Sequence, residues 1–150
     1  MICVVEVDPR RSRNMAAIRS RDTAAELALR RELHRRGRRF YVNRRVLGDR
    51  RSVDLVFPRL HVAVFVDGCF WHACPQHSKP PRINTDYWSP KLARNVERDR
   101  RTDAELRAAG WAVVRVWEHE SLDAAASRVE AALDAAIDRS PTCSGQLAQQ

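Results

Sequence analysis

The stretch SVDLVFPRLHVAVFV, residues 52 to 66, decides the fold class of this chain. It holds two apolar runs, residues 52 to 57 and 61 to 66, and Pro58 ends the first of them. Short runs of β-branched and aromatic residues that stop at proline predict β-strands. The second run is apolar at nearly every position, which is typical of a central strand covered on both faces. The stretch therefore predicts the middle of a sheet with helices packed against it.

Helices and strands are expected on both sides of this stretch. A capping-box pattern, with Thr23 three residues before Glu26, begins a helix that Gly37 ends. Ser89 and Pro90 are residue types preferred at a helix cap and at the first helical position. In chain order we expect a helix over 22–37, a strand over 38–46, the two strands of the quoted stretch, a helix over 89–109, a strand over 111–117 and a helix over 121–137. This order predicts an α/β fold in which helices flank a mixed central β-sheet.

The composition predicts a nucleic-acid partner. The chain of 150 residues carries a net charge of +8 and has a pI of about 10.3, which favours polyanions. Nearly all of its 27 basic residues are arginines, which bind phosphate and guanine in a bidentate manner. A GC-rich genome would also produce an excess of arginine. The net charge itself still requires a partner or a role in solubility.

The length fits one domain with a core of its own. We expect a basic N-terminal arm over residues 1–20, a folded domain over 21–139 and a disordered tail over 140–150. Cys69 and Cys74 lie close together while Cys3 and Cys143 lie near the ends, which is typical of the reducing cytoplasm and not of a disulfide framework. The opening MICVVEV is too short for a signal peptide or a membrane span. A cytoplasmic protein without a membrane partner is therefore expected.

A group of cysteines and histidines predicts a structural zinc site. Cys69, Cys74 and His77 follow the third expected strand with the spacing C-x4-C-x2-H. Zinc favours four such ligands in a tetrahedron, and His119, after the fourth expected strand, could complete the set. Zinc would rigidify a loop that has little core of its own. The alternative is two buried free cysteines with scattered surface histidines.

Two aspartates mark a candidate Mg²⁺ site at the strand ends. Asp54 interrupts an apolar strand, where an unpaired carboxylate costs free energy, and Asp67 ends the next strand. Neighbouring strand ends could bring the Asp54 carboxylate and the backbone of Val66 and Asp67 to one ion. Mg²⁺ takes oxygen ligands and usually keeps several waters, so few protein ligands suffice. Such an ion stabilises charge on a scissile phosphate. The alternative for Asp54 is a turn residue on an edge strand.

Further polar side chains are candidates for the same site. His72 follows Trp71 and could act as a general base, and Glu26 could orient it if the first helix lies beside this loop. The alternatives are a solvated or supporting imidazole and a Glu26 that serves the capping box alone. Asn95 and Asp99 lie on or beside the helix stripe that should face the core, where polar groups require hydrogen-bond partners. We expect both to point into the site, although a marginal helix with a solvated face would give the same pattern.

Four ordered segments resemble the very-short-patch-repair DNA mismatch endonucleases: RSRNMAAIRSRDTAAE at 11–26, GCFWH at 68–72, NVERDRR at 95–101 and GWAVVRVWE at 110–118. The resemblance spans residues 9 to 121. It implies a restriction-endonuclease-like fold with a structural zinc, and a bacterial enzyme that uses Mg²⁺ to nick duplex DNA 5′ of the T in a T:G mismatch. Such mismatches arise by deamination of 5-methylcytosine. We further expect a monomer, with mismatch-repair proteins as possible partners.

The resemblance also implies roles for single residues. Asp54 matches the metal-binding aspartate, the Val66 carbonyl its second protein ligand, and His72 the proposed general base with Glu26 as its partner. Asn95 and Asp99 match polar residues that line the same site. The remaining matches are residues that wedge into the duplex at the mismatch, where a mispaired step opens more cheaply than a matched one: Phe70, Trp71, Trp88 and, in the N-terminal arm, Met15.

The chain departs from the family pattern at three positions. Val53 stands where a Pro often precedes the aspartate, Val66 stands where some members have Thr, and Asp67 stands at a position of uncertain role. No Lys follows Asp67, which favours a His-based mechanism. Two other functions stay open: a related nuclease of a restriction-modification system, and a non-catalytic, zinc-stabilised DNA-binding module. The carboxylate of Asp54 argues against the second, and the aromatic residues could also be ordinary core.

Overall fold

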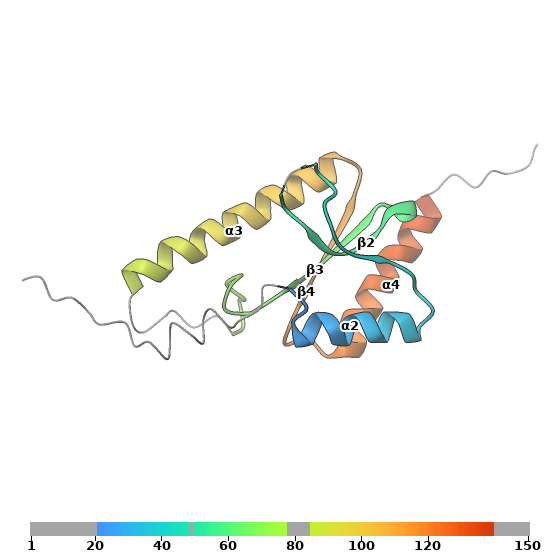
Figure 1. The fold of residues 1–150 in the computed structure, drawn as a ribbon, viewed down its shortest axis with the longest axis horizontal. Coiled ribbons are helices and arrows are strands. Elements are labelled where there is room, and N and C mark those ends of the chain that lie inside the picture. The colour runs from blue at the N-terminus through green and yellow to red at the C-terminus, as the bar shows by residue number, and fades with distance from the viewer. Residues whose placement is uncertain (1–20, 49, 78–84, 140–150) are drawn as a thin grey trace, which may run out of the picture.

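The computed structural model of the protein describes residues 21–48, 50–77 and 85–139. The expected arm over 1–20, with Met15, and the expected tail over 140–150 lie outside the described residues. The described elements, in chain order, are α2 (Ala24–Arg35), β1 (Tyr41–Arg44), β2 (Val53–Phe57), the 3-10 turn η1 (Pro58–Leu60), β3 (Val62–Asp67), α3 (Thr85–Ala108), β4 (Ala112–Trp117) and α4 (Leu122–Arg139) (Figure 1).

The sheet contains four strands in the order β1-β2-β3-β4. β1 pairs with β2 and β2 pairs with β3 in antiparallel fashion, whereas β3 and β4 run parallel and are joined through α3. The predicted mixed α/β fold is thus confirmed. The apolar run of β3 lies inside the sheet, and five of its six residues are buried. β1 lies at the edge, where Tyr41 and Val42 stay exposed.

The two faces of the sheet carry different helices (Figure 1). Side chains alternate between the faces with a period of two, so Val62 and Val64 of β3 join the core under α2 and α4, while Ala63 and Phe65 join the core under α3. On the first face Leu29 and Leu33 of α2 are almost fully buried. By the same alternation, three polar side chains of the strands point to the face of Ala63 and Phe65: Asp54, Asp67 and Arg115. The polar residues of the sheet therefore belong to the face that α3 covers.

Helix α3 begins earlier than the sequence predicts. Ser89 and Pro90 were expected at its start, but the helix begins at Thr85 and Pro90 lies inside it. A proline this close to the N-terminus removes only one internal hydrogen bond, the one to the Asp86 carbonyl, which limits the cost. Trp88 packs against two aromatic residues of the loop after β3, and this contact supports the additional turn.

Within the described part of the chain, no helix combines the length and the apolar composition that crossing a bilayer requires.

Candidate active site and metal cluster

The carboxylate of Asp54 lies against the backbone of Val66. The ladder between β2 and β3 ends at the pair Leu55 and Val64. Beyond this pair the Val66 N–H donates to Asp54 Oδ2 at 2.8 Å, so the side chain takes the place of a strand partner. The structure thus brings together the two residues expected to hold Mg²⁺.

The surroundings of Asp54 favour a cation. Burial raises the pKa of Asp54 to about 6; the hydrogen bond from Val66 opposes this shift, while the negative charges of Glu26 and Asp67 add to it. A buried carboxylate beside other acids is costly when ionised, and a bound cation removes that cost. The donor set, which consists of oxygens, fits Mg²⁺.

His72 is held from α3, because its Nδ1 lies 2.5 Å from Asp99 Oδ2. An ionised carboxylate can only accept, so Nδ1 is the donor and the lone pair of Nε2 is left available. Four residues earlier on the same helix, Asn95 donates to the backbone carbonyl of Trp71 at 3.2 Å. The polar residues Asn95 and Asp99 of α3 therefore have hydrogen-bond partners, and these contacts fix the orientation of the loop that follows β3.

The pKa values of this pair shift in opposite directions. Burial opposes a charge on His72, but the hydrogen bond to Asp99 and the charges of Asp67 and Asp99 outweigh it, so the pKa of His72 is raised. Burial likewise opposes a charge on Asp99, but the hydrogen bond to His72 and the nearby cations hold the pKa of Asp99 below its usual range. The pair favours an imidazole of increased basicity.

Glu26 lies in the same cleft but makes different contacts. Its carboxylate accepts hydrogen bonds from the Asp22 N–H, the Thr23 hydroxyl and Arg30, at 3.0 to 3.2 Å. Thr23 in turn accepts from the Glu26 N–H, so the predicted capping box is formed. The partner of His72 Nδ1, which was expected to be Glu26, is Asp99. Glu26 contributes negative charge near Asp54.

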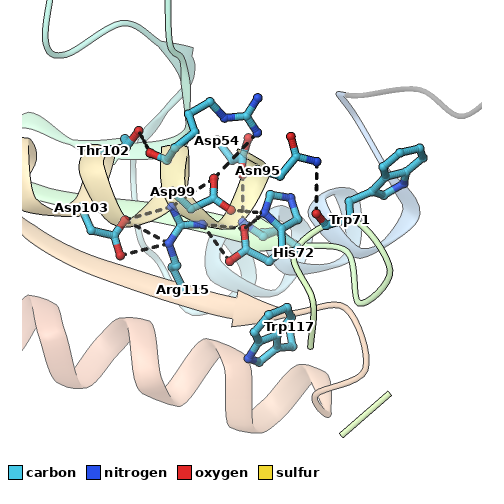
Figure 2. A network of polar contacts seen from close by, with 12 residues as sticks. Asp54, Trp71, His72, Asn95, Asp99, Thr102, Asp103, Arg115 and Trp117 are labelled. Atoms are coloured by element: carbon cyan, nitrogen blue, oxygen red, sulfur yellow. Dashed lines mark hydrogen bonds and ion pairs between the residues drawn. The ribbon is translucent and has the colours of Figure 1, made fainter. Parts of the chain in front are cut away.

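A guanidinium among three aspartates is the feature that sequence reasoning missed; Figure 2 labels Arg115 and two of these aspartates, Asp99 and Asp103. Arg115 of β4 bonds both oxygens of Asp67 at 2.8 Å and reaches Asp103 at 2.9 Å and Asp99 at 3.7 Å. Burial opposes its charge, but Asp103 and Asp67 outweigh this and raise the pKa of Arg115. Because Arg115 binds both oxygens of the Asp67 carboxylate, that carboxylate is less available as a metal ligand. The sequence signal was a charged residue inside the apolar run VVRVW.

The site lies in a cleft of about 680 Å³ between the sheet, α3 and the start of α2. Buried or half-buried carboxylates and exposed arginines line it together: Glu26, Asp54, Asp67, Asp99, Arg21, Arg50 and Arg98. An acidic interior attracts metal ions, and the arginines at its surface suit a polyanionic substrate.

The predicted metal cluster assembles beside this cleft. Ligand atoms of Cys69, Cys74, His77 and His119 all lie within 4.8 Å of one another. Cys69 Sγ is 3.0 Å from His119 Nδ1, and Cys74 Sγ is 3.7 Å from the same atom. In a tetrahedral zinc site sulfur and nitrogen ligands are separated by about 3.5 Å, so the group could hold a metal. Glu118, also missed by sequence reasoning, accepts the Cys69 N–H at 2.7 Å and ties the loop to β4.

The three described aromatic residues with an expected role in the duplex form one cluster. The rings of Phe70, Trp71 and Trp88 lie 5.1 to 5.9 Å apart, centre to centre, and each is half-buried. The indole of Trp71 points away from the polar network (Figure 2). These side chains lie outside the two sheet cores, in the loop after β3 and at the start of α3.

Comparison with known proteins gives consistent matches. Residues 5–77 match the family described as DNA mismatch endonuclease Vsr. The type II nicking enzyme V.NaeI of Lentzea aerocolonigenes is 52% identical over 79% of this chain and 74% of its own length. The type II nicking enzyme V.XorIIP of Xanthomonas oryzae is 41% identical, with 87% and 94% covered. The DNA mismatch endonuclease Vsr of Escherichia coli is 41% identical, with 72% and 69% covered.

These matches agree with the geometry of the site, in which the carboxylate and imidazole groups share one cleft and the cysteine–histidine cluster lies beside it. The hypothesis of a non-catalytic DNA-binding module is therefore wrong, because the matched family and relatives are enzymes. The chain is a DNA endonuclease and belongs to the DNA mismatch endonuclease Vsr family.

Proposed function

We propose that this endonuclease hydrolyses one phosphodiester bond of duplex DNA, 5′ of the T in a T:G mismatch, and so starts very short patch repair in the bacterial cytoplasm. The contact of the Asp54 carboxylate with the Val66 backbone, beside an oriented His72, is the observation that carries the proposal. The family description and the relative from Escherichia coli, both named as mismatch endonucleases, support the choice of substrate.

Asp54 and the Val66 carbonyl would hold Mg²⁺, which supplies charge stabilisation at the scissile phosphate when bound. His72 accepts the proton of the attacking water at Nε2, because Asp99 holds its other nitrogen. Asp99 stabilises the imidazolium that forms. Arg115 keeps Asp67 and Asp99 in place through ion pairs and limits the negative charge that meets the phosphate.

Zinc is the ion proposed for Cys69, Cys74, His77 and His119, in a structural role. The loop between β3 and α3 carries His72 and two of the aromatic residues, and the four side chains would fix it at both β3 and β4. Phe70, Trp71 and Trp88 would enter the duplex beside the mismatch, together with Met15. The restriction-endonuclease-like fold belongs to the same proposal, which the mixed sheet with helices on both faces supports.

A second candidate is a nicking enzyme that accompanies a restriction-modification system. The relative from Lentzea aerocolonigenes, named a type II nicking enzyme, favours it at 52% identity. The two candidates differ in the sequence around the cut and not in the chemistry at Asp54 and His72.

The test is a nicking assay on labelled duplexes that differ at one base pair. With Mg²⁺ the protein should nick T:G duplexes 5′ of the T and leave the matched T:A duplex intact. Duplexes that place the mismatch in different flanking sequences separate the two candidates, because a restriction-associated enzyme should require one recognition sequence. Equal nicking of matched and mismatched DNA would contradict mismatch specificity.

A further inference from the structure

Helix α3 carries a row of exposed basic residues next to the catalytic cleft. Lys91, Arg94, Arg98 and Arg101 follow each other at intervals of three, four and three residues, so they lie along one face of the helix. At 1.5 Å per residue the row is about 15 Å long. We call these four residues the α3 basic stripe.

Arg36, on the opposite side of the sheet, is neutralised by several carboxylates at short distances, whereas the α3 basic stripe has fewer and longer contacts with carboxylates. Arg36 pairs with Glu32, Glu130 and Asp123, at 2.6 to 2.9 Å, where α2 meets α4. In the stripe, Arg94 donates to the backbone carbonyl of Pro90 and pairs with no carboxylate among the described residues. Unneutralised and exposed guanidinium groups are suited to bind an external anion.

The remaining members of the stripe have weak or longer contacts. Arg98 has a side chain that is 55% exposed and lies 3.8 Å from Asp99, and Arg101 lies 3.4 Å from Glu105. Lys91 Nζ lies over the indole of Trp88, 5.1 Å from the ring centre. These contacts orient the basic groups while leaving their charge available.

The stripe joins the two functional parts of the molecule. At one end Lys91 lies near Trp88 and Trp71 of the aromatic cluster, and further along Arg98 lines the catalytic cleft. The N-terminal half of α3 extends beyond the sheet toward the loop that carries the aromatic residues (Figure 1). A backbone bound along this helix would pass from the aromatic residues to Asp54 without leaving the basic surface.

Electrostatics requires such a surface. The cleft holds the acidic side chains of Glu26, Asp54 and Asp67, which repel a phosphate until cations offset them. A DNA strand carries one phosphate per 3.4 Å of helix axis, so a row of about 15 Å matches roughly four nucleotides.

We propose that the α3 basic stripe binds the sugar–phosphate backbone of the strand that is cut. It fixes the distance along the DNA between the step opened by the aromatic residues and the scissile phosphate at Asp54. The inference rests on the proposed function for the position of the cut, but the contact with DNA phosphates does not depend on a mismatch.

The salt dependence of DNA binding tests this inference. The dissociation constant is measured by fluorescence anisotropy on uncut duplex, without Mg²⁺, for the wild type and for Arg94→Gln/Arg98→Gln. Each lost phosphate contact lowers the slope of log K against log salt by about 0.9, so the double variant should lose about 1.8 and Arg94→Gln alone about 0.9. Matched and T:G duplexes should weaken by the same factor, since phosphate contacts read no sequence.

The matched control is Arg59→Gln/Arg100→Gln, which removes the same charge from exposed positions outside the stripe. It should keep the wild-type slope. An unchanged slope in Arg94→Gln/Arg98→Gln would overturn the inference and would mean that the stripe binds a partner other than DNA. An equal loss of slope in both double variants would also overturn it. All substituted side chains are exposed, so thermal melting should match the wild type. If the wild type does not prefer T:G duplexes, the proposed substrate fails while the slopes still decide the role of the stripe.

Discussion

At the scale of single residues, the chemistry proposed for the cleft depends on the position of one proton. Asp99 holds His72 Nδ1 at 2.5 Å and raises the pKa of the imidazole against the effect of burial. A general base works only in its neutral form, so nicking should fall as the pH drops through this raised pKa.

Asp99→Asn should move the acidic limb of the pH–rate profile to lower pH. The substitution removes the negative charge of Asp99, whose hydrogen bond is the largest contribution that raises the pKa of His72, and leaves only the charge of Asp67 to oppose burial. The plateau rate should fall by about tenfold to a hundredfold, less than the roughly 10²–10⁴ that a positioned general base supplies. Single-turnover nicking between pH 5.5 and 9, a range of about one unit below to beyond two units above the ordinary pKa of His, measures both effects. Glu97→Gln, an exposed change on the same helix, serves as the control and should shift nothing. An acidic limb that stays in place in Asp99→Asn would mean that His72 is not the titrating base.

At the scale of elements, the proposed zinc would link the loop after β3 to the residues that follow β4. Cys69 and Cys74 lie in this loop, whereas His119 follows β4. A loop with little apolar core gains its order from such a cross-link.

Purified wild-type protein should contain about one zinc per chain, the number that a four-ligand site holds. Cys74→Ala should lose the zinc and most of the nicking activity, because the loop that positions His72 is released. His34→Gln, which alters a histidine packed on Phe40, should keep both. The measurement is metal analysis after dialysis, together with the nicking rate. Stoichiometric zinc in Cys74→Ala would place the ion elsewhere.

Helix α2 offers a matched pair of leucines that tests its packing. Leu33 is fully buried under the sheet, whereas Leu27 is 36% exposed on the same helix. Leu33→Ala should lower the free energy of unfolding by about 2–5 kcal/mol, because it removes buried methyl groups and leaves a cavity. Leu27→Ala should lower the free energy of unfolding by less than about 1 kcal/mol, since the partly exposed Leu27 side chain gains little free energy from burial. Urea denaturation distinguishes them, and equal losses would contradict the placement of α2.

At the scale of the whole molecule, the apolar runs were sufficient to predict the sheet and its helices. Local composition sets the strands, so β2 and β4 lie within the predicted ranges and β3 extends one residue beyond its range, to Asp67. Asp54 could be found because a carboxylate inside an apolar strand is costly, and His119 because zinc requires a fourth ligand. Both inferences rest on a requirement that is visible in the sequence: a buried carboxylate needs a partner, and a zinc site needs four ligands.

What could not be predicted depends on which residues meet across the fold. The partner of His72 is Asp99 and not Glu26, because α3 and not α2 supplies that contact. Arg115 is readable as an anomaly in a strand, but its three aspartates come from β3 and α3, far apart in sequence. The start of α3 depends on packing with the preceding loop, which local helix signals at Ser89 do not encode.

The central claim is that Asp54 at the Val66 backbone forms the catalytic metal site of a mismatch-nicking endonuclease. The most direct test is the single-turnover rate of Mg²⁺-dependent nicking on a T:G duplex for the wild type and Asp54→Asn, at enzyme concentrations that saturate the DNA. Asp54→Asn should lose activity by about a thousandfold, since metal assistance is worth several kcal/mol and each 1.36 kcal/mol is about tenfold in rate. Binding to the duplex should persist. Nicking by Asp54→Asn at the wild-type rate would contradict the account.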